Sequence, residues 1–168
     1  FGGSNTRFYN RGNGSDLYRR TVYTFFKRTA PHPMFANFDA PSREQFCIKR
    51  ERSNTPLQAL QLLNDVQHFE AARGLAERTM KASPGSAKRL EFIFRTVLSR
   101  LPDADERQIV TAFFEQQKAR YVKAPAEAKK AIGFGESKAD ASLDAVELAS
   151  WALVANLVLN MDEALVRN

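Results

Sequence analysis

The sequence predicts a mainly α-helical protein, with about five helices in an orthogonal or bundle packing behind an irregular N-terminal arm that has room for one strand. Two observations support this prediction. After residue 55, apolar residues recur every three or four positions, and residues that cap or break helices separate these recurrences. Residues 1–55 show no such period and are rich in glycine, asparagine, proline and aromatic residues. We therefore expect a basic, aromatic arm over 1–55 and a helical domain over 56–168.

The arm begins with a segment that favours turns and ends with one that proline keeps irregular. Glycine, asparagine and serine recur through residues 1–16, and three prolines interrupt residues 29–42. Between them, residues 17–28 (LYRRTVYTFFKR) are rich in β-branched and aromatic side chains, which favours a strand, although a short helix is the alternative. Since no second strand is predicted nearby, such a strand would pair outside this chain or lie covered.

The junction between arm and helical domain has the residues of a helix N-terminus. Thr55 is a suitable N-cap, Pro56 occupies the first helical position, and Gln58 is placed to complete a capping box. Such a cap contributes roughly 1 kcal/mol. It fixes where the first long helix begins and has no bearing on chemistry.

Five stretches of the helical domain have the spacing of amphipathic helices, and a shorter sixth is bounded by Pro125. The predicted helices are 56–64, 66–81, 87–101, 104–123, 125–132 and 145–161. Asp65, Asp103 and Asp144 are the expected N-caps of the second, fourth and last of these. Trp151 is the largest apolar side chain in the last helix, and we expect it to anchor that helix in the core.

Charge and aromatic residues are concentrated in the arm. Residues 1–55 hold ten Lys/Arg against four Asp/Glu, a balance of +6, whereas residues 56–168 hold fifteen of each. Ten of the eighteen aromatic residues lie in the arm as well. Basic residues interleaved with rings suit single-stranded nucleic acid, but the neutral remainder of the chain lacks the usual basic footprint. The favoured interpretation is an arm that lies over the helical domain, where it buries its rings and directs its arginines at carboxylates or helix C-termini.

Composition excludes several classes of site. The one cysteine, Cys47, rules out an internal disulfide and paired-cysteine metal or haem sites. No apolar run approaches the length of a membrane span. The chain begins at Phe1 without an initiator methionine, so we expect it to be part of a longer polypeptide.

Catalytic and metal sites find little support in the residue pattern. A nucleophile and base would have to be Cys47 with His32 or His68, and no spacing supports that pair, so a buried structural thiol is the favoured interpretation. The two histidines lie on different predicted elements, which disfavours a shared metal. We expect no catalytic residue, no metal and no cofactor in this chain, and we do not expect it to be an enzyme on its own.

A cluster of charged and polar residues around the junction is the best candidate binding site. Arginine forks beside carboxylates suit a sulfated or carboxylated sugar, a phosphate, or the acidic face of a redox partner. The same residues equally suit a structural network that ties the arm to the first helix, and this interpretation is favoured. The cluster comprises Lys27, Arg28, Asp39, Arg43, Glu44, Arg50, Arg52 and Asn54.

Three motifs resemble one known family. The motifs LYRR, FDAP and NTPLQAL-LND lie within residues 17–65, and the ending GESKADASLDAVELASWALVANLVLNMDEALVRN also fits. The chain therefore resembles the planctomycete secreted-domain family, a C-terminal domain of unknown function in large extracytoplasmic proteins. His32 and Val66 stand where the family is expected to have proline, and Cys47 is displaced from the expected cysteine position, which weakens any ligand or catalytic role for His32 and Cys47.

The resemblance implies a location and possible neighbours, and no reaction. It implies an extracytoplasmic location, periplasmic or secreted, and partners among the other domains of the parent polypeptide, including a cytochrome c-like domain. Haem would then belong to that domain and not to this chain. We expect a non-catalytic structural or protein–protein interaction module; the alternatives are a site for an anionic polysaccharide built on the arginine cluster, and single-stranded nucleic-acid binding by the arm.

Overall fold

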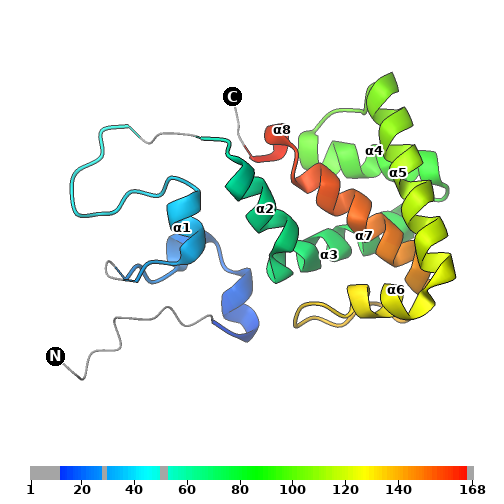
Figure 1. Cartoon of the computed structure of the whole chain (residues 1–168), viewed down its shortest axis with the longest axis horizontal. Helices are drawn as coiled ribbons and strands as arrows, with labels where there is room; N and C mark the ends of the chain where they lie inside the picture. The colour runs from blue at the N-terminus through cyan, green and yellow to red at the C-terminus, as the bar shows by residue number, and fades with distance from the viewer. Residues whose placement is uncertain (1–11, 28–29, 50–52, 166–168) are drawn as a thin grey trace. The chain divides into compact units, whose positions relative to one another are not determined.

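The fold is described from a computed structural model of the chain, over residues 12–27, 30–49 and 53–165 (Figure 1). These residues form two short 3-10 helices and eight α-helices, and no strand occurs among them. The mainly helical class is therefore confirmed. The elements are η1 (Gly14–Tyr18), η2 (Thr21–Tyr23), α1 (Pro33–Asn37), α2 (Pro56–Asn64), α3 (Val66–Ala82), α4 (Ser86–Leu98), α5 (Ala104–Lys123), α6 (Pro125–Ile132), α7 (Ala145–Leu159) and α8 (Asp162–Leu165).

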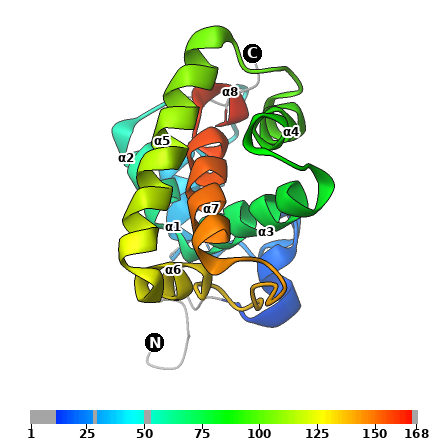
Figure 2. The same cartoon turned by 90° about the vertical axis from the view of Figure 1, so that its right-hand side faces the viewer.

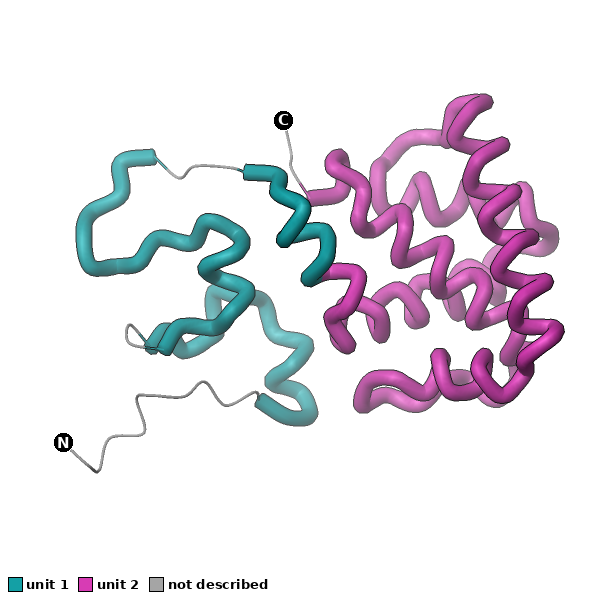
Figure 3. The backbone as a smooth tube through the Cα atoms, in the orientation of Figure 1, with its two compact units in different colours: residues 1–61 teal, residues 62–168 magenta. Residues whose placement is uncertain are grey.

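The chain divides into two compact units, unit 1 over residues 1–61 and unit 2 over residues 62–168 (Figure 3). The boundary falls inside α2. The sequence places the border between arm and helical domain after Thr55, where the residue composition changes. That border stays a prediction. Within the described residues, no helix has both the length and the apolar character needed to cross a membrane.

Unit 2 is built around α7, which is buried on nearly all sides. α7 packs against α3, α5 and α6, and more lightly against α4 and α8; Figure 2 shows it between α5 and α3. Trp151 is 2% exposed and stacks on Phe114, with ring centroids 4.3 Å apart. The ring pair adds about 0.5–1.5 kcal/mol to the burial of its apolar area. The anchoring role predicted for Trp151 is therefore confirmed.

Three helices of unit 2 begin at the predicted aspartate caps. The side chain of Asp65 accepts from the backbone N–H of His68 at 2.8 Å, and that of Asp144 accepts from Glu147 at 2.8 Å. Asp103 and Glu106 form the reciprocal bonds of a capping box, 2.7 and 2.9 Å long. These aspartates fix the starts of α3, α5 and α7 within the sequence.

A buried cation joins α3 to the loop between α6 and α7. Arg73 is 2% exposed, and its guanidinium donates to the carbonyls of Ile132, Phe134 and Ser137 at 2.6, 3.2 and 2.9 Å. Glu70 and Glu77 lie 3.7 and 3.5 Å from the guanidinium. A buried charge is tolerated only when it is paired and hydrogen-bonded, so these partners are what permits Arg73 to lie inside. We call this set the Arg73 network.

Glu70 holds the other side of the same loop, and Gly135 makes room for it. The Glu70 carboxylate accepts from the backbone N–H groups of Glu136 and Ser137, at 3.2 and 2.7 Å, and from the Ser137 hydroxyl. Gly135 has φ +100°, and a Cβ at this position would overlap the Glu70 carboxyl. Both the backbone conformation and the close approach therefore require glycine.

Ion pairs on the outside of unit 2 shift the pKa values of their members. Arg100 donates to both oxygens of Glu106, at 2.7 and 2.6 Å, and pairs with Glu163 of α8 at 2.8 Å; the hydrogen bonds from Arg100 lower the pKa of Glu106. The hydrogen bond from Lys81, 2.5 Å away, holds the pKa of Asp140 below its usual range. These pairs tie α8 and the α6–α7 loop to neighbouring helices.

Unit 1 differs from the prediction in two segments. The strand considered over 17–28 is absent from its described part, 17–27: Thr21–Tyr23 is a 3-10 helix, and Tyr18 ends another. The strand prediction is thus wrong for these residues, because β-propensity forms a strand only where a partner strand exists. Residues 33–37, predicted irregular, form α1, which Pro33 begins and the Nδ1 of His32 caps by accepting from the Met34 N–H at 3.1 Å.

The side-chain amide of Gln58 organises the described part of unit 1. Its oxygen accepts from the Thr55 N–H at 3.0 Å, and its nitrogen donates to the Asn37 carbonyl at 2.6 Å and to the Ser53 hydroxyl at 3.0 Å. The Thr55 hydroxyl accepts from the Gln58 N–H at 3.3 Å, so the predicted capping box is confirmed. These contacts, the Gln58 network, join the end of α1 to the start of α2.

Replacing two glycines tests the space beside Glu70. We expect Gly135→Ala to lower the free energy of unfolding by roughly 2–4 kcal/mol, because the methyl group displaces Glu70 and φ +100° is strained. Gly74→Ala is the control: it lies within α3 with no atom within 4 Å of the added Cβ, so it should raise stability by about 0.5–1 kcal/mol. Chemical denaturation measures both. Equal effects of the two substitutions would contradict the close approach.

Two glutamines of α2 test the Gln58 network. Gln58→Ala should reduce the local stability of unit 1 by roughly 2–4 kcal/mol, because three buried or half-buried polar groups lose their partner. Gln61→Ala removes one bond, from the Asn37 amide at 2.5 Å, and should cost about 1 kcal/mol. Amide hydrogen exchange reports the two units separately, and protection of α7 should not change. Equal exchange rates in the two variants would show that Gln58 is not central to unit 1.

Candidate docking surface

The described part of unit 1 exposes large apolar side chains and buries almost none. The one side chain that is fully buried there is the polar Gln58, which is 3% exposed. Eight large apolar or aromatic residues of the same part are 56–91% exposed: Tyr18, Val22, Tyr23, Phe25, Phe46, Ile48, Leu57 and Leu60. Single exposed apolar residues are ordinary, whereas contiguous apolar patches mark interaction surfaces. These eight residues fall into short runs in the sequence, at 18–25, 46–48 and 57–60.

Basic residues flank the exposed apolar segments. Arg19 and Arg20 precede Val22 to Phe25, and Lys27 follows them. In the second segment, Arg43 and Lys49 stand on either side of Phe46 to Ile48. Apolar side chains flanked by basic ones are complementary to an apolar surface that has carboxylates at its rim.

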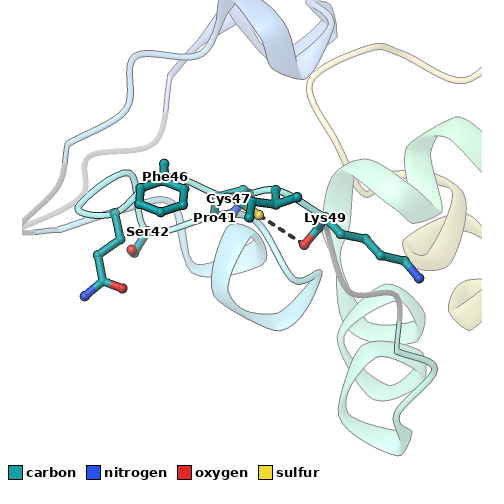
Figure 4. Close-up of a pocket in the computed structure, with 7 residues that line it drawn as sticks. Pro41, Ser42, Phe46, Cys47 and Lys49 are labelled. Carbon is teal, nitrogen blue, oxygen red and sulfur yellow. Dashed lines mark hydrogen bonds between the residues drawn. The ribbon is translucent and has the colours of Figure 1, made fainter.

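The loop after α1 forms an open groove of about 440 Å³ (Figure 4). Its lining combines an aromatic ring, a hydroxyl, an amide and an ammonium group: Pro41, Ser42, Gln45, Phe46, Cys47, Ile48 and Lys49. The Cys47 thiol is exposed and donates to the Lys49 carbonyl, with Sγ and O 3.2 Å apart. The predicted buried thiol is therefore wrong, because the loop has no apolar core in which to place it.

Arg43 belongs to a stack of flat groups beside this loop. Its guanidinium carbon lies 4.6 Å from the centroid of the Phe26 ring. Phe26 stacks on Phe35, with centroids 5.5 Å apart and planes 9° apart, and His32 lies 5.4 Å from Phe35. Within the described part of the chain, the guanidinium has no hydrogen-bond or ion-pair partner, so its N–H edge is open. Arg43 also has φ +62°, which costs about 1 kcal/mol in a residue with a Cβ.

Asp39 has a structural role in the turn before the groove. Its carboxylate accepts from the backbone N–H and the hydroxyl of Ser53, at 2.8 and 2.6 Å. These bonds accompany a backbone with φ +55°. Asp39 thus extends the Gln58 network, which also contains Ser53, and holds the residues on both sides of the groove loop together.

The structure shows contacts for some members of the predicted arginine cluster. Asp39 lies with Ser53, next in sequence to Asn54, whereas Arg43 lies on Phe26, next to Lys27. Glu44 is exposed, and its backbone N–H donates to the Ser42 hydroxyl at 3.4 Å. Three members lie outside the described residues: Arg28, Arg50 and Arg52. The binding role of the cluster as a whole stays a prediction.

The two histidines have separate surroundings in the described residues. Among these residues, no group of three or more His, Cys, Asp and Glu side chains is placed to hold a metal ion. His32 caps α1. His68 is half-buried in α3, where burial lowers its pKa against the opposing charge of Asp65. Neither imidazole has a described bond to Cys47.

Reasoning from the sequence missed the exposed leucines of α2. The i, i+3 spacing of Leu57, Leu60 and Leu63 indicates one apolar helix face, yet the three side chains are 48–58% exposed. The absence of any charged residue within α2 was the available signal, since a helix exposed to water normally carries charge. The absence of charge in α2 also supports a helix face that another protein surface covers.

The comparisons with known proteins identify a family and nothing closer. No curated protein and no solved structure matches the chain. The family model PSD1, described as a protein of unknown function (DUF1553), matches residues 3–114, which include unit 1 from residue 3 onward, α3, α4 and the first half of α5. The match does not reach residues 135–168, for which the resemblance stays a prediction. Because the match spans more than half of the chain, the protein belongs to the PSD1 family of proteins of unknown function.

Proposed function

We propose that this chain is a non-catalytic docking module, whose unit 1 binds the surface of another protein domain. The supporting observation is that the described part of unit 1 exposes eight large apolar side chains while its one fully buried side chain is Gln58. Full burial of one such side chain contributes roughly 1.5–3 kcal/mol. A partner that covers even part of this set gains enough free energy to hold the module in place.

The partner in this proposal is another domain of the same polypeptide. A domain in the same chain is present at high effective concentration, so a modest apolar surface suffices for stable docking. The family resemblance adds a cytochrome c-like domain as a specific neighbour to test. The proposal includes an extracytoplasmic location, which fractionation of cells that make the protein tests directly.

The single cysteine provides a probe of this surface. Cys47 lies between Phe46 and Ile48, and its thiol is exposed in this chain. We expect iodoacetamide to modify Cys47 at least roughly tenfold more slowly in the full-length gene product than in the isolated 168-residue chain, because a docked domain excludes solvent from the loop. Peptide mass spectrometry measures the rates.

Two variants make the labelling experiment specific. In a Cys47→Ser background, Val122→Cys places a thiol at an exposed apolar position of α5, and its labelling rate should be the same in both contexts. Phe46→Ser with Ile48→Ser should restore fast labelling of Cys47 in the full-length product. Equal rates at Cys47 in the two contexts would overturn the docking proposal.

The open edge of Arg43 supports a second candidate function, binding of an anionic polysaccharide. A guanidinium held over the Phe26 ring presents paired donors, which suit the carboxylate of a uronic acid or a sulfate ester. The neighbouring groove supplies a ring face at Phe46 and polar groups at Ser42 and Gln45. The positive φ of Arg43 is strained, and strained residues cluster at functional sites, which supports a binding role for this side chain.

Titration calorimetry with uronic, sulfated and neutral oligosaccharides tests this candidate. We expect the anionic sugars to bind, and Arg43→Lys to weaken binding at least roughly tenfold, because an ammonium group cannot replace the fork. Arg95→Lys, at an exposed arginine of α4, is the matched control and should change nothing. Absence of binding to every anionic sugar, or equal binding by Arg43→Lys, would remove the candidate.

A further inference from the structure

The outer face of α5, in unit 2, has a stripe of residues with the spacing of a coiled coil. Successive members are separated by four, three, four, three and four residues, the interval at which side chains return to one side of a supercoiled helix. We call this stripe the α5 seam: Asp105, Ile109, Ala112, Gln116, Ala119 and Lys123. All six residues are exposed.

The α5 seam is separate from the face of α5 that packs in the core. The inner face consists of the buried Val110, Phe114 and Tyr121, and α5 packs against α7; Figure 2 shows α5 running along α7. Ile109 nevertheless is 66% exposed on the outer side. One exposed apolar residue is ordinary by itself, but Ile109 lies within the heptad-spaced α5 seam, on the side of α5 away from the core, where a second helix would cover it.

The α5 seam is symmetric about Phe114. Asp105 and Lys123 lie nine residues to either side of it. Ile109 and Ala119 lie five residues away, and Ala112 and Gln116 two. In an antiparallel pair of identical helices related by a two-fold axis, each residue faces the one at equal distance on the other side of the centre. A second copy of α5 therefore places Lys123 opposite Asp105, and Ala119 opposite Ile109.

Charge complementarity favours this second copy over other occupants. Neither Asp105 nor Lys123 forms an ion pair with any residue that the structure describes, so both charges are available. An antiparallel pair forms two ion pairs between Asp105 and Lys123. It also places the N-terminus of each helix beside the C-terminus of the other, so that the helix dipoles attract. The small side chains of Ala112 and Ala119 permit close approach, so that Ile109 reaches the partner helix. A parallel pair, by contrast, would place Asp105 against Asp105.

We propose that α5 binds α5 of a second copy of this chain as an antiparallel, two-fold symmetric dimer. One helix pair is a small interface with one large apolar residue per copy, so the dimer is weak, with a dissociation constant on the order of 10–1,000 μM. This association uses unit 2 and does not depend on the proposed function of unit 1.

A charge exchange tests the pairing directly. Sedimentation velocity of the full 168-residue chain should show a dimer whose fraction rises with concentration and falls between about 0.05 and about 0.5 M salt. Lys123→Asp alone and Asp105→Lys alone should each weaken the dimer at least roughly tenfold, because two attractive pairs become repulsive. The double variant Asp105→Lys/Lys123→Asp should recover most of the loss.

The controls separate pairing from folding. Lys130→Asp makes the same change of charge at an exposed position of α6, outside the α5 seam, and should leave the dimer unchanged. Circular dichroism checks that each variant keeps its helix content, since both substitutions oppose the dipole of α5. A chain that is monomeric at all concentrations, a dimer insensitive to either single substitution, or a double variant as weak as the singles would each overturn the proposal.

Discussion

Unit 1 depends on the amide of Gln58. Its three side-chain bonds, and the bond that the Gln58 backbone N–H donates to the Thr55 hydroxyl, fix the end of α1 against the start of α2, so that hydrogen bonds take the place of an apolar core. A hydrogen bond adds a net of about 1 kcal/mol, whereas burial of one large apolar side chain adds roughly 1.5–3 kcal/mol. The described part of unit 1 thus leaves its larger source of stability unused. This imbalance is the physical reason for placing a partner on its exposed rings.

In unit 2, apolar burial is the larger source of stability and side-chain hydrogen bonds are the smaller one. Burial of α7 supplies an apolar core, and the buried guanidinium of Arg73 donates to the carbonyls of Ile132, Phe134 and Ser137 and lies beside two carboxylates. The conformation of the loop after α6 follows from that charge, because moving any of the three carbonyls away would leave part of a buried guanidinium without a partner. The core of unit 2 is therefore complete within the chain. A partner of unit 2 binds its outside, where α5 presents its seam.

The sequence predicts local features of the helices better than it predicts which faces are covered. The caps at Thr55, Asp65, Asp103 and Asp144 are predicted correctly because capping depends on residues within one turn. Burial of Arg73 was not predictable, since its partners lie about 60 positions away in a segment without periodicity.

The exposure of Leu57 and Leu60 was missed for a different reason. An apolar stripe indicates that a helix face is covered, but not whether the covering surface belongs to the same chain. The candidate site has the same limit: the sequence shows which charged residues lie near one another along the chain, but not that Asp39 bonds to Ser53 or that Arg43 lies over the Phe26 ring.

The three proposed surfaces differ in the force that each uses, and this makes them separable in one preparation. Docking through Phe46 and Ile48 is driven by apolar burial, which added salt does not screen. Contacts of Arg43 with an anion and of Asp105 with Lys123 are ionic and exposed, so they weaken as salt rises. The two ionic surfaces are distinguished by concentration: self-association through α5 falls on dilution of the chain, whereas binding of a sugar at Arg43 depends on the sugar alone. An association that survives high salt and dilution therefore belongs to the apolar surface of unit 1.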